Sequence, residues 1–280
     1  MSALRVSGRS GLALYAVATV LAVIWLVPVV GAFMISVLPL SETRQGWWQP
    51  GLGDLTFGNY SRAWQEGLSS YVVDSFVITI GAVLLSVLLG SLAAYAFSRL
   101  RFRLKGLAYF LLITTMIVPV QIILIPLLPW FQTLHLTGEV SQYVGIILVH
   151  VAFGAGWAIF MLGGFMSEIP EDMLEAARID GASHLGVFRH VVLPLSLPGI
   201  ASFALIDFVF VWNDLLLALT LLDRDHQPIT VGLANLQAPH LAQENLVSAG
   251  SILAILPPLL LFALLNRYYV RGLFAGGVKG

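Results

Sequence analysis

Two carboxylates lie within a strongly apolar stretch of this 280-residue chain, where a charged side chain needs a partner. Asp207 and Asp214 are seven residues apart, so in a continuous helix they share one face. A carboxylate at mid-membrane costs about 2.5 to 3.5 kcal/mol on insertion scales, and it therefore usually faces a cavity or a partner. Carboxylates accept hydrogen bonds from hydroxyl groups, so this face could line the path of a polyhydroxylated solute. Bonding to neighbouring helices is the other open interpretation.

Four more polar or aromatic side chains join these candidates for a solute path. Trp212 and Asn213 directly precede Asp214, and the Trp212 ring could stack on a sugar ring. Gln121 lies in an apolar segment that also contains three prolines, and the backbone groups that proline frees need partners. We therefore expect that segment to be kinked and to face a bundle interior. His150 stands alone in another apolar segment, where packing is its more ordinary role and ligand binding the alternative.

The stretch from Glu168 to Pro198 is a polar interruption between two apolar segments. Glu171 to Ile179 has the composition of a helix, and Gly181 is a natural stop because glycine adopts positive φ without steric cost. A second short amphipathic helix is expected from Ser183 to Val191. The fixed spacing is Glu175-Ala176-Ala177, then Gly181, then Val191, Leu193 and Pro194.

This spacing resembles the cytoplasmic EAA loop of ATP-binding cassette (ABC) importer permeases, with Val191 where that pattern usually has Ile. The resemblance implies that residues 168–196 form the loop that couples a permease to its ATPase. Glu175 would contact a basic group of the ATPase, while Ala176, Ala177 and Gly181 supply the fit. Arg178, Asp180 and Pro194 belong to the same coupling set.

Composition places the chain in a membrane. It is 58% hydrophobic and 10% charged, with a net charge of -1 and no cysteine. Soluble domains average about 45 to 50% apolar and about 25% charged residues. The charge balance shows no nucleic-acid footprint, and the absence of cysteine excludes disulfides and thiolate metal sites.

Six segments are long and apolar enough to span a bilayer, which takes about 20 residues. They are Gly11 to Leu38, Val72 to Phe97, Leu107 to Phe131, Tyr143 to Phe165, Pro198 to Leu222 and Leu246 to Leu265. Alternate loops hold eleven of the 14 Lys and Arg residues, among them Arg99 to Lys105, which we assign to topology and to anionic lipid. The prediction is a single all-α domain over residues 1–280 with six transmembrane helices, both termini cytoplasmic, and a type I ABC importer permease architecture.

Two further elements carry the resemblance. Trp212-Asn213-Asp214 is similar to an element common in carbohydrate permeases, and residues 271–280 are similar to the ending of the smaller maltose permease subunit. That second likeness implies that the tail, including Gly276, Gly277 and Lys279, contacts the ATPase. The chain itself has no phosphate loop of the form G-x-x-x-x-G-K-[ST], no metal-ligand cluster and no recognisable nucleophile and base, so no cofactor or enzymatic activity is expected.

The resemblance implies a sugar importer subunit in a bacterial or archaeal cytoplasmic membrane. Its implied partners are a second related permease, two ATP-binding cassette subunits and an extracytoplasmic solute-binding protein. An ion-driven secondary carrier that uses Asp207 is the alternative, and a membrane-embedded enzyme is a weaker one. The particular sugar is not readable, so a monosaccharide, a disaccharide and glycerol phosphate all stay open.

Overall fold

The computed structural model describes residues 9–43, 46–48, 55–236 and 243–277, and within these ranges every regular element is helical. The chain divides into two compact units, of which the first is Met1–Leu68 with Leu233–Ala254 and the second is Ser69–Gly232 with Ile255–Gly280. Both candidate functional regions lie in the second unit.

The first unit contains the first predicted span, observed as α1 (Arg9–Ser36). The short helices α2 (Leu40–Thr43), α3 (Gly58–Ala63) and η1 (Trp64–Leu68) follow, with the end of α13 (Ile229–Leu236) and the start of α14 (Glu244–Gly277). Buried amides hold this unit together. Asn59 donates to the carbonyls of Ser36 and Leu38 at 2.8 and 2.9 Å, and Asn245 donates to the Asn59 side-chain oxygen at 2.9 Å.

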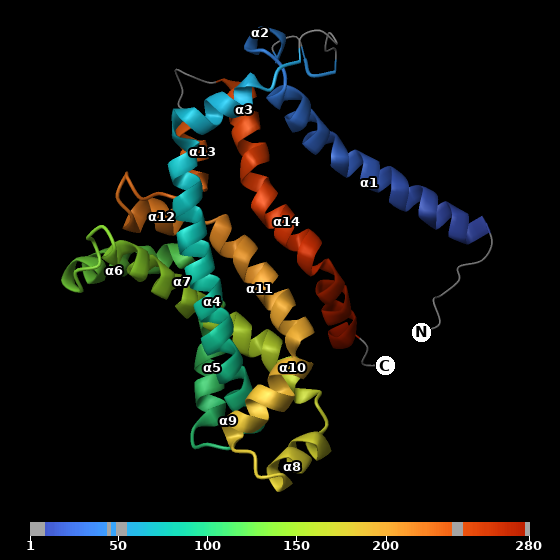
Figure 1. Cartoon of the computed structure of the whole chain (residues 1–280), viewed down its shortest axis with the longest axis vertical. Helices are drawn as coiled ribbons and strands as arrows, with labels where there is room; N and C mark the ends of the chain where they lie inside the picture. The colour runs from blue at the N-terminus through green and yellow to red at the C-terminus, as the bar shows by residue number, and fades with distance from the viewer. Residues whose placement is uncertain (1–8, 44–45, 49–54, 237–242, 278–280) are drawn as a thin grey trace. The chain divides into compact units, whose positions relative to one another are not determined.

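The second unit is organised by two long helices, α4 (Ser69–Arg99) and α7 (Ser141–Ser167), which pack side by side (Figure 1). Small residues make the close approach possible. A Cβ added to Gly90 would clash with the Cβ of Ala158, and one added to Gly81 would lie 2.7 Å from Ile147. The small residues of α4 at these positions therefore serve helix packing.

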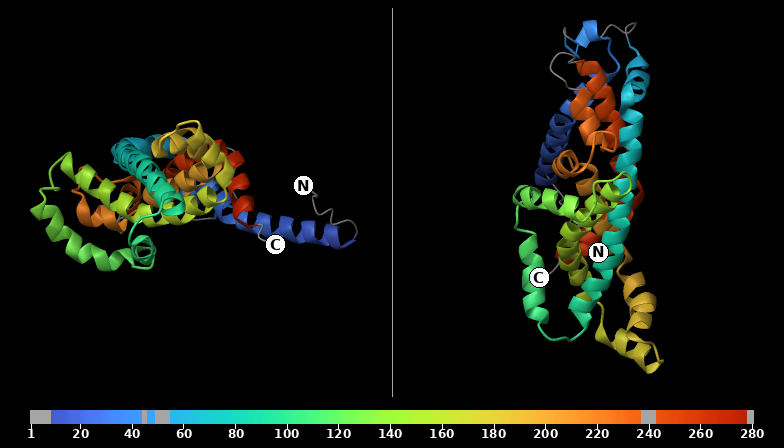
Figure 2. Two further views of the ribbon diagram at one scale, coloured as in Figure 1. Left: turned by 90° about the horizontal axis from the view of Figure 1, so that it is seen from below. Right: turned by 90° about the vertical axis from the view of Figure 1, so that its left-hand side faces the viewer.

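Two predicted spans are broken rather than straight. The third comprises α5 (Lys105–Thr115) and α6 (Val120–Thr133), which meet at 98° across a four-residue break (Figure 2). Pro119 directly precedes α6, whereas Pro126 and Pro129 lie inside it. The fifth ends early, because α11 (Leu197–Trp212) is followed by a gap and then by α12 (Leu216–Leu221).

Among the residues that the structure describes, four single helices are long and apolar enough to cross a membrane, and the number rises to six if each bent pair counts as one span. The bent pairs are α5 with α6, and the helix His184–Leu195 with α11, which meet at 76°. The all-helical fold class is therefore confirmed, and the expected count of six holds only with the bent pairs included.

Between α7 and α11 the chain forms a helical hairpin, which Figure 1 shows at the end of the second unit farthest from α12. Its first arm is α8 (Glu171–Ile179). The second arm is continuous through α9 (His184–Val187), the π-helical turn η2 (Phe188–Val192) and α10 (Leu193–Leu195). We call residues 168–196 the coupling segment.

Candidate functional site

The turn of the coupling segment is a Schellman motif centred on Gly181. The Ala182 amide donates to the Ala177 carbonyl and the Gly181 amide donates to the Arg178 carbonyl, both at 3.0 Å. Gly181 has φ +87°, a conformation that other residues adopt only at a cost, and a Cβ there would meet nothing within 4 Å. The predicted stop at Gly181 is confirmed, and its cause is backbone conformation rather than lack of space.

One side of the coupling segment is part of the core of the second unit. Leu174 and Val187 are fully buried, and the Phe188 ring lies 5.3 Å from that of Tyr95 on α4. These residues join a cluster with Ala158, Leu162 and other side chains of α4, α7 and α11. The hairpin is therefore packed onto the long helices and does not hang free.

The other side of the coupling segment is exposed and presents the predicted contact residues. Glu175, Ala176, Asp180 and Pro194 are all exposed, while Ala177 is half-buried against the core cluster. Ile179 and Leu185 beside them are 85% and 66% exposed, which is unusual for large apolar side chains at a turn. This face combines a carboxylate, small residues and apolar side chains, as a protein-docking surface does.

Arg99, the last residue of α4, holds the coupling segment against α7. Its guanidinium donates to the carbonyls of Met166, where the Nε bond is 2.9 Å, and of Ile169. It also donates to Glu171 Oε2 at 3.0 Å, and Glu171 Oε1 in turn accepts from Arg178 at 3.1 Å. A cation at the C-terminal end of a helix also interacts favourably with the helix dipole.

This contact adds a role for Arg99 that the sequence did not indicate. The Arg99 side chain is only 11% exposed and is bonded to protein. Arg178, predicted to flank the ATPase contact, is paired within the hairpin to Glu171, and its side chain is 35% exposed. Sequence reasoning missed the role of Arg99 because its acceptors lie about 70 residues away and two of them are backbone carbonyls.

Asp207 lies on α11 and faces α4 and α7 from a buried position. Its side chain is near Ser86 and Gly154, since a Cβ on Gly154 would lie 3.1 Å from Asp207 Oδ1 and 2.8 Å from Ser86 Oγ. Asp207 is 5% exposed, and its Oδ2 has no hydrogen-bond partner among the described residues. The missing side chain of Gly154 thus leaves room for a carboxylate in the interior.

Asp214 lies outside any helix, so the premise that it shares a helix face with Asp207 is wrong. It occupies the gap between α11 and α12. Its carboxylate accepts hydrogen bonds from the backbone amides of Leu217 at 3.3 Å and Ala218 at 3.0 Å, and these bonds cap the start of α12. On the other side of the gap, the side-chain amide of Asn213 donates a hydrogen bond to the Val209 carbonyl at the end of α11, at 2.7 Å. Both polar residues of the Trp-Asn-Asp element therefore stabilise a helix break.

His150, another candidate for the solute path, lies next to Asp214. It lies on α7, is 2% exposed, and its Nε2 is 3.7 Å from Asp214 Oδ2, while neither ring nitrogen has a hydrogen bond within the described residues. His150 and Gly154 are four residues apart, one turn of α7. Asp214 and Asp207 therefore lie along one face of α7, although not along one face of α11.

Trp212 and Gln121 differ from what the sequence led us to expect. Trp212 is 2% exposed, with its ring stacked on Phe208 at 5.5 Å and in edge contact with Phe76 at 5.0 Å, so it offers a solute no open face in this structure. Gln121 and the three prolines of its segment are exposed rather than turned into the second unit. The geometry supports a packing role for Trp212.

A polar network at the start of α7 was not anticipated. Gln142 donates to Asp223 Oδ2 at 2.9 Å and accepts the Asp223 amide at 3.0 Å, and the His226 ring lies 2.6 Å from Asp223 Oδ1. The hydrogen bond to Asp223 raises the pKa of His226. Desolvation alone would raise the pKa of Asp223, but its bonds with His226 and Gln142 outweigh that effect and lower it.

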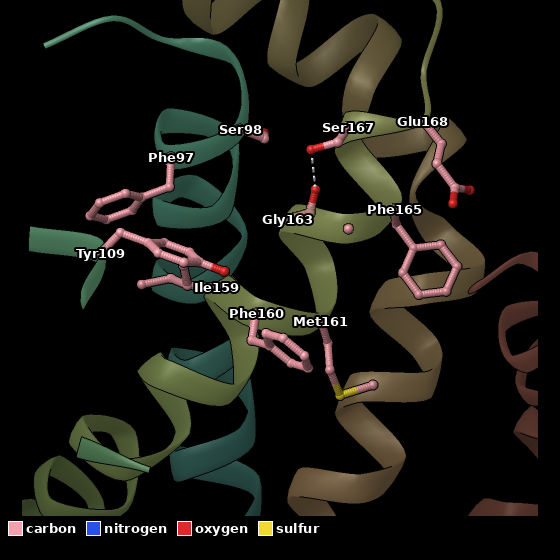
Figure 3. Close-up of a pocket in the computed structure, with 11 residues that line it drawn as sticks. Phe97, Ser98, Tyr109, Ile159, Phe160, Met161, Gly163, Phe165, Ser167 and Glu168 are labelled. Atoms are coloured by element: carbon pink, nitrogen blue, oxygen red, sulfur yellow. Dashed lines mark hydrogen bonds between the residues drawn. The ribbon is translucent and has the colours of Figure 1, made fainter. Parts of the chain in front are cut away.

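A hollow of about 770 Å³ lies between the ends of α4, α5 and α7 (Figure 3). Figure 3 shows Phe97 and Tyr109 on one side of it and Phe165 on the other, with the Ser167 hydroxyl donating to the Gly163 carbonyl at 2.7 Å. Glu168, where the coupling segment begins, is at its edge.

The predicted ATPase-contacting tail is described only in part. The backbone of α14 continues as helix to Gly277, so Gly276 and Gly277 form its last residues. Lys279 lies outside the described residues.

Comparison with known proteins decides the family. Residues 86–274 match the family described as the binding-protein-dependent transport system inner membrane component. The chain belongs to this family. It is thus a membrane-embedded transporter component, as the sequence predicted, with ATP hydrolysis carried out by separate chains. Nothing in the comparisons supports an ion-driven carrier.

Two relatives show how far the similarity of this family member extends. It is 36% identical to the osmoprotective compounds uptake permease protein GgtD of Synechocystis sp., over 92% of this chain and 89% of the relative. It is 35% identical to the melibiose/raffinose/stachyose import permease protein MelC of Bacillus subtilis, over 81% of this chain and 82% of the relative.

The fold agrees with a solved structure. A bacterial ABC transporter involved in the import of the acidic polysaccharide alginate matches with a TM-score of 0.78 and 23% identity, over 94% of this chain and 99% of that one. The fold of this permease is therefore that of a type I ABC importer permease.

Proposed function

We propose that this permease carries a sugar across the cytoplasmic membrane as one subunit of an ATP-driven importer. Its proposed partners are a second related permease, two ATP-binding cassette subunits and an extracytoplasmic solute-binding protein. The family's description as binding-protein-dependent and the sugar-importing relative MelC support this assignment.

The observation that carries the proposal is the two-sided coupling segment. Its buried side packs onto α4 and α7, and its exposed side presents Glu175, Ala176 and Ile179 at the outside of the turn. When the ATPase subunits close, a segment held in this way moves together with the helices it is packed on. Glu175 makes a charge-assisted contact with the ATPase. Gly181 adopts the positive φ that the turn requires.

For ATP hydrolysis to be coupled to transport, binding of the solute-binding protein and binding of ATP must each favour the same state of the membrane helices. The tail at Gly276 and Gly277 is proposed as a second contact with the ATPase. Asp207, His150 and Asp214 are proposed to lie beside the solute path along α7.

The test begins with affinity purification of the permease from its native membrane. We expect a second permease and an ATPase to be recovered with it, and ATP hydrolysis to accompany sugar uptake after reconstitution. Recovery of the chain alone, with uptake driven by an ion gradient, would overturn the proposal.

Substitutions at Gly181 then test the coupling segment. A non-glycine residue in the left-handed region costs about 1 to 2 kcal/mol, and Asn is better tolerated than Ala. We expect Gly181→Ala to lower the ratio of uptake to ATP hydrolysis more than Gly181→Asn. Gly106→Ala is the control, because a Cβ at Gly106 meets nothing within 4 Å and its φ is not positive. A Gly181→Ala importer with wild-type coupling would refute the role of this turn.

A further inference from the structure

The hollow of Figure 3 is a concave site with walls from three helices. Its volume of about 770 Å³ falls within the range of about 300 to 1,000 Å³ that is usual for ligand sites. Phe97 of α4, Tyr109 of α5 and Phe165 of α7 line it (Figure 3). The rings of Phe97 and Tyr109 lie 6.0 Å apart, and a Cβ added to Gly199 of α11 would lie 2.6 Å from the Phe165 ring. Packing therefore holds the walls on both sides.

Two consecutive glycines of α7, Gly163 and Gly164, also line the hollow. Glycine weakens a helix interior relative to alanine, so it usually has a packing or functional reason there. A Cβ added to either glycine would meet nothing within 4 Å, and neither glycine has a positive φ. Packing within this chain therefore does not require them. What their missing side chains provide is open space, which an apolar chain can fill.

Lys105, the first residue of α5, lies beside the hollow. It precedes Tyr109 by four residues, so the two side chains share one face of α5. Its ammonium donates to the carbonyl of Leu100, directly after α4, at 3.0 Å. Lys105 thus bridges the end of α4 and the start of α5. Because an ammonium has three N–H donors, Lys105 can bind a further acceptor while it keeps this bond.

Arg103 is a second cation beside the hollow. It lies in the turn that precedes α5, next to Phe102, whose ring is 5.4 Å from that of Phe97 in the hollow wall. Glu168 is the acidic member of the lining, and it belongs to the end of α7, across the hollow from α5 (Figure 3). A negatively charged group is therefore attracted to the α5 side of the hollow and repelled from the end of α7.

We propose that the hollow is a binding site for an anionic phospholipid, with one acyl chain along Gly163 and Gly164 and the headgroup phosphate bonded by Lys105 and Arg103. Charge selects this occupant, because basic pockets between membrane helices bind anionic lipid headgroups. Exposed apolar side chains alone would be covered by any lipid, whereas a concave site beside two cations favours one class. The inference goes beyond the proposed function and does not depend on which solute is carried.

The test uses the permease purified in detergent together with the subunits that copurify with it. Native mass spectrometry follows the binding of added phosphatidylglycerol and, separately, of phosphatidylcholine with the same acyl chains. Other surfaces of the complex also bind lipid, so the difference between wild type and variant reports this site. We expect phosphatidylglycerol to bind more tightly than phosphatidylcholine, by about fivefold for each cation that contacts the headgroup. Equal affinity for the two lipids would overturn the proposal.

Substitutions of the two cations test the headgroup contact. Lys105→Gln removes the charge but keeps an N–H donor for the Leu100 carbonyl, so α5 stays anchored. We expect Lys105→Gln and Arg103→Gln each to weaken phosphatidylglycerol binding about fivefold and to leave phosphatidylcholine binding unchanged. Lys105→Arg keeps the charge and should restore the preference. A wild-type preference for phosphatidylglycerol in both Gln variants would refute the headgroup contact.

Gly163→Leu tests the place of the acyl chain. The Leu side chain fills part of the hollow, and α7 stays folded because Leu favours a helix more than Gly does. We expect this variant to retain one phosphatidylglycerol molecule fewer than the wild type. Gly106→Leu is the matched control, because a Cβ at Gly106 also meets nothing within 4 Å but Gly106 does not line the hollow. Equal lipid retention in the two variants would overturn the site.

Two other occupants would give different results. If the second permease fills the hollow, Gly163→Leu should lower the amount of that permease recovered and leave lipid retention unchanged. If a free phosphate ion binds at Lys105, inorganic phosphate should displace phosphatidylglycerol, and the acyl chains should add nothing to its affinity. Either result would overturn the lipid site while leaving the importer assignment intact, because no step of this test measures transport.

Discussion

Replacing Arg99 by Met should release the coupling segment from α7 while leaving the membrane helices folded. Met keeps an apolar stem of similar length and removes the guanidinium. The lost bonds are those to the carbonyls of Met166 and Ile169 and to the carboxylate of Glu171. These acceptors lie at the end of α7 and the start of the coupling segment, so the effect should be local.

The magnitude follows from the exposure of each bond. Hydrogen bonds from a charged donor contribute about 1.5 to 3 kcal/mol each, and the two freed carbonyls belong to Met166 and Ile169, which are both buried. Glu171 is 49% exposed, so its ion pair with Arg99 adds only about 0 to 1 kcal/mol. A total of about 3 to 7 kcal/mol raises the open population of the coupling segment by about 100-fold or more.

Hydrogen exchange on the reconstituted importer measures this directly. Amides of α8 should lose protection by the factor above in Arg99→Met and by less in Arg99→Lys, because an ammonium lacks the planar fork that reaches several acceptors. Uptake per ATP hydrolysed should fall in parallel. Arg101→Met is the control, since it removes the same charge from an exposed position. Equal loss of protection in the Arg99 and Arg101 variants would show that charge, and not this contact, matters.

Two other predictions concern packing and pH. Gly90→Ala should destabilise the permease by about 1 to 3 kcal/mol by forcing α4 away from Ala158, whereas Gly106→Ala stays near neutral, and thermal unfolding of the two variants checks this. His226 should titrate above its ordinary pKa of 6.5 because it bonds Asp223, so its contribution to loop stability is complete below pH 6.5 and is lost as pH rises through the raised pKa. An NMR titration of His226 with a pKa at or below 6.5 would contradict the bond, and Asp223→Asn should remove the shift.

Local features were the ones that sequence reasoning predicted well. The turn at Gly181 depends on residues within six positions of one another, and the helix α8 before it is one continuous stretch of nine residues. Apolar length likewise predicted α1, α4, α7 and α14, because a bilayer demands it. These features could be predicted because their causes lie in contiguous residues.

Features that depend on distant partners could not be predicted. The acceptors of Arg99 are carbonyls 67 to 70 residues away, and a carbonyl has no signature in a sequence. Asp207 and Asp214 seemed to share a helix because apolar composition continues past Trp212. The helix breaks there because the side chains of Asn213 and Asp214 bond to backbone groups at the two helix ends. Such side-chain bonds compete with the backbone bonds of a continuing helix, and hydropathy does not reveal them.

The coupling segment and the proposed solute path share one element, α7, which therefore connects them. One face of this helix carries His150 and Gly154, four residues apart, and so lies next to Asp214 and Asp207 in turn. The last turn of α7 is bonded to Arg99, and its C-terminal half packs with the coupling segment. Because packed helices shift as bodies rather than deform, a displacement of the coupling segment by the ATPase must either break the Arg99 bonds or move α7 along α11. The second course changes the surroundings of Asp207 directly, which is what coupling of ATP to solute release requires.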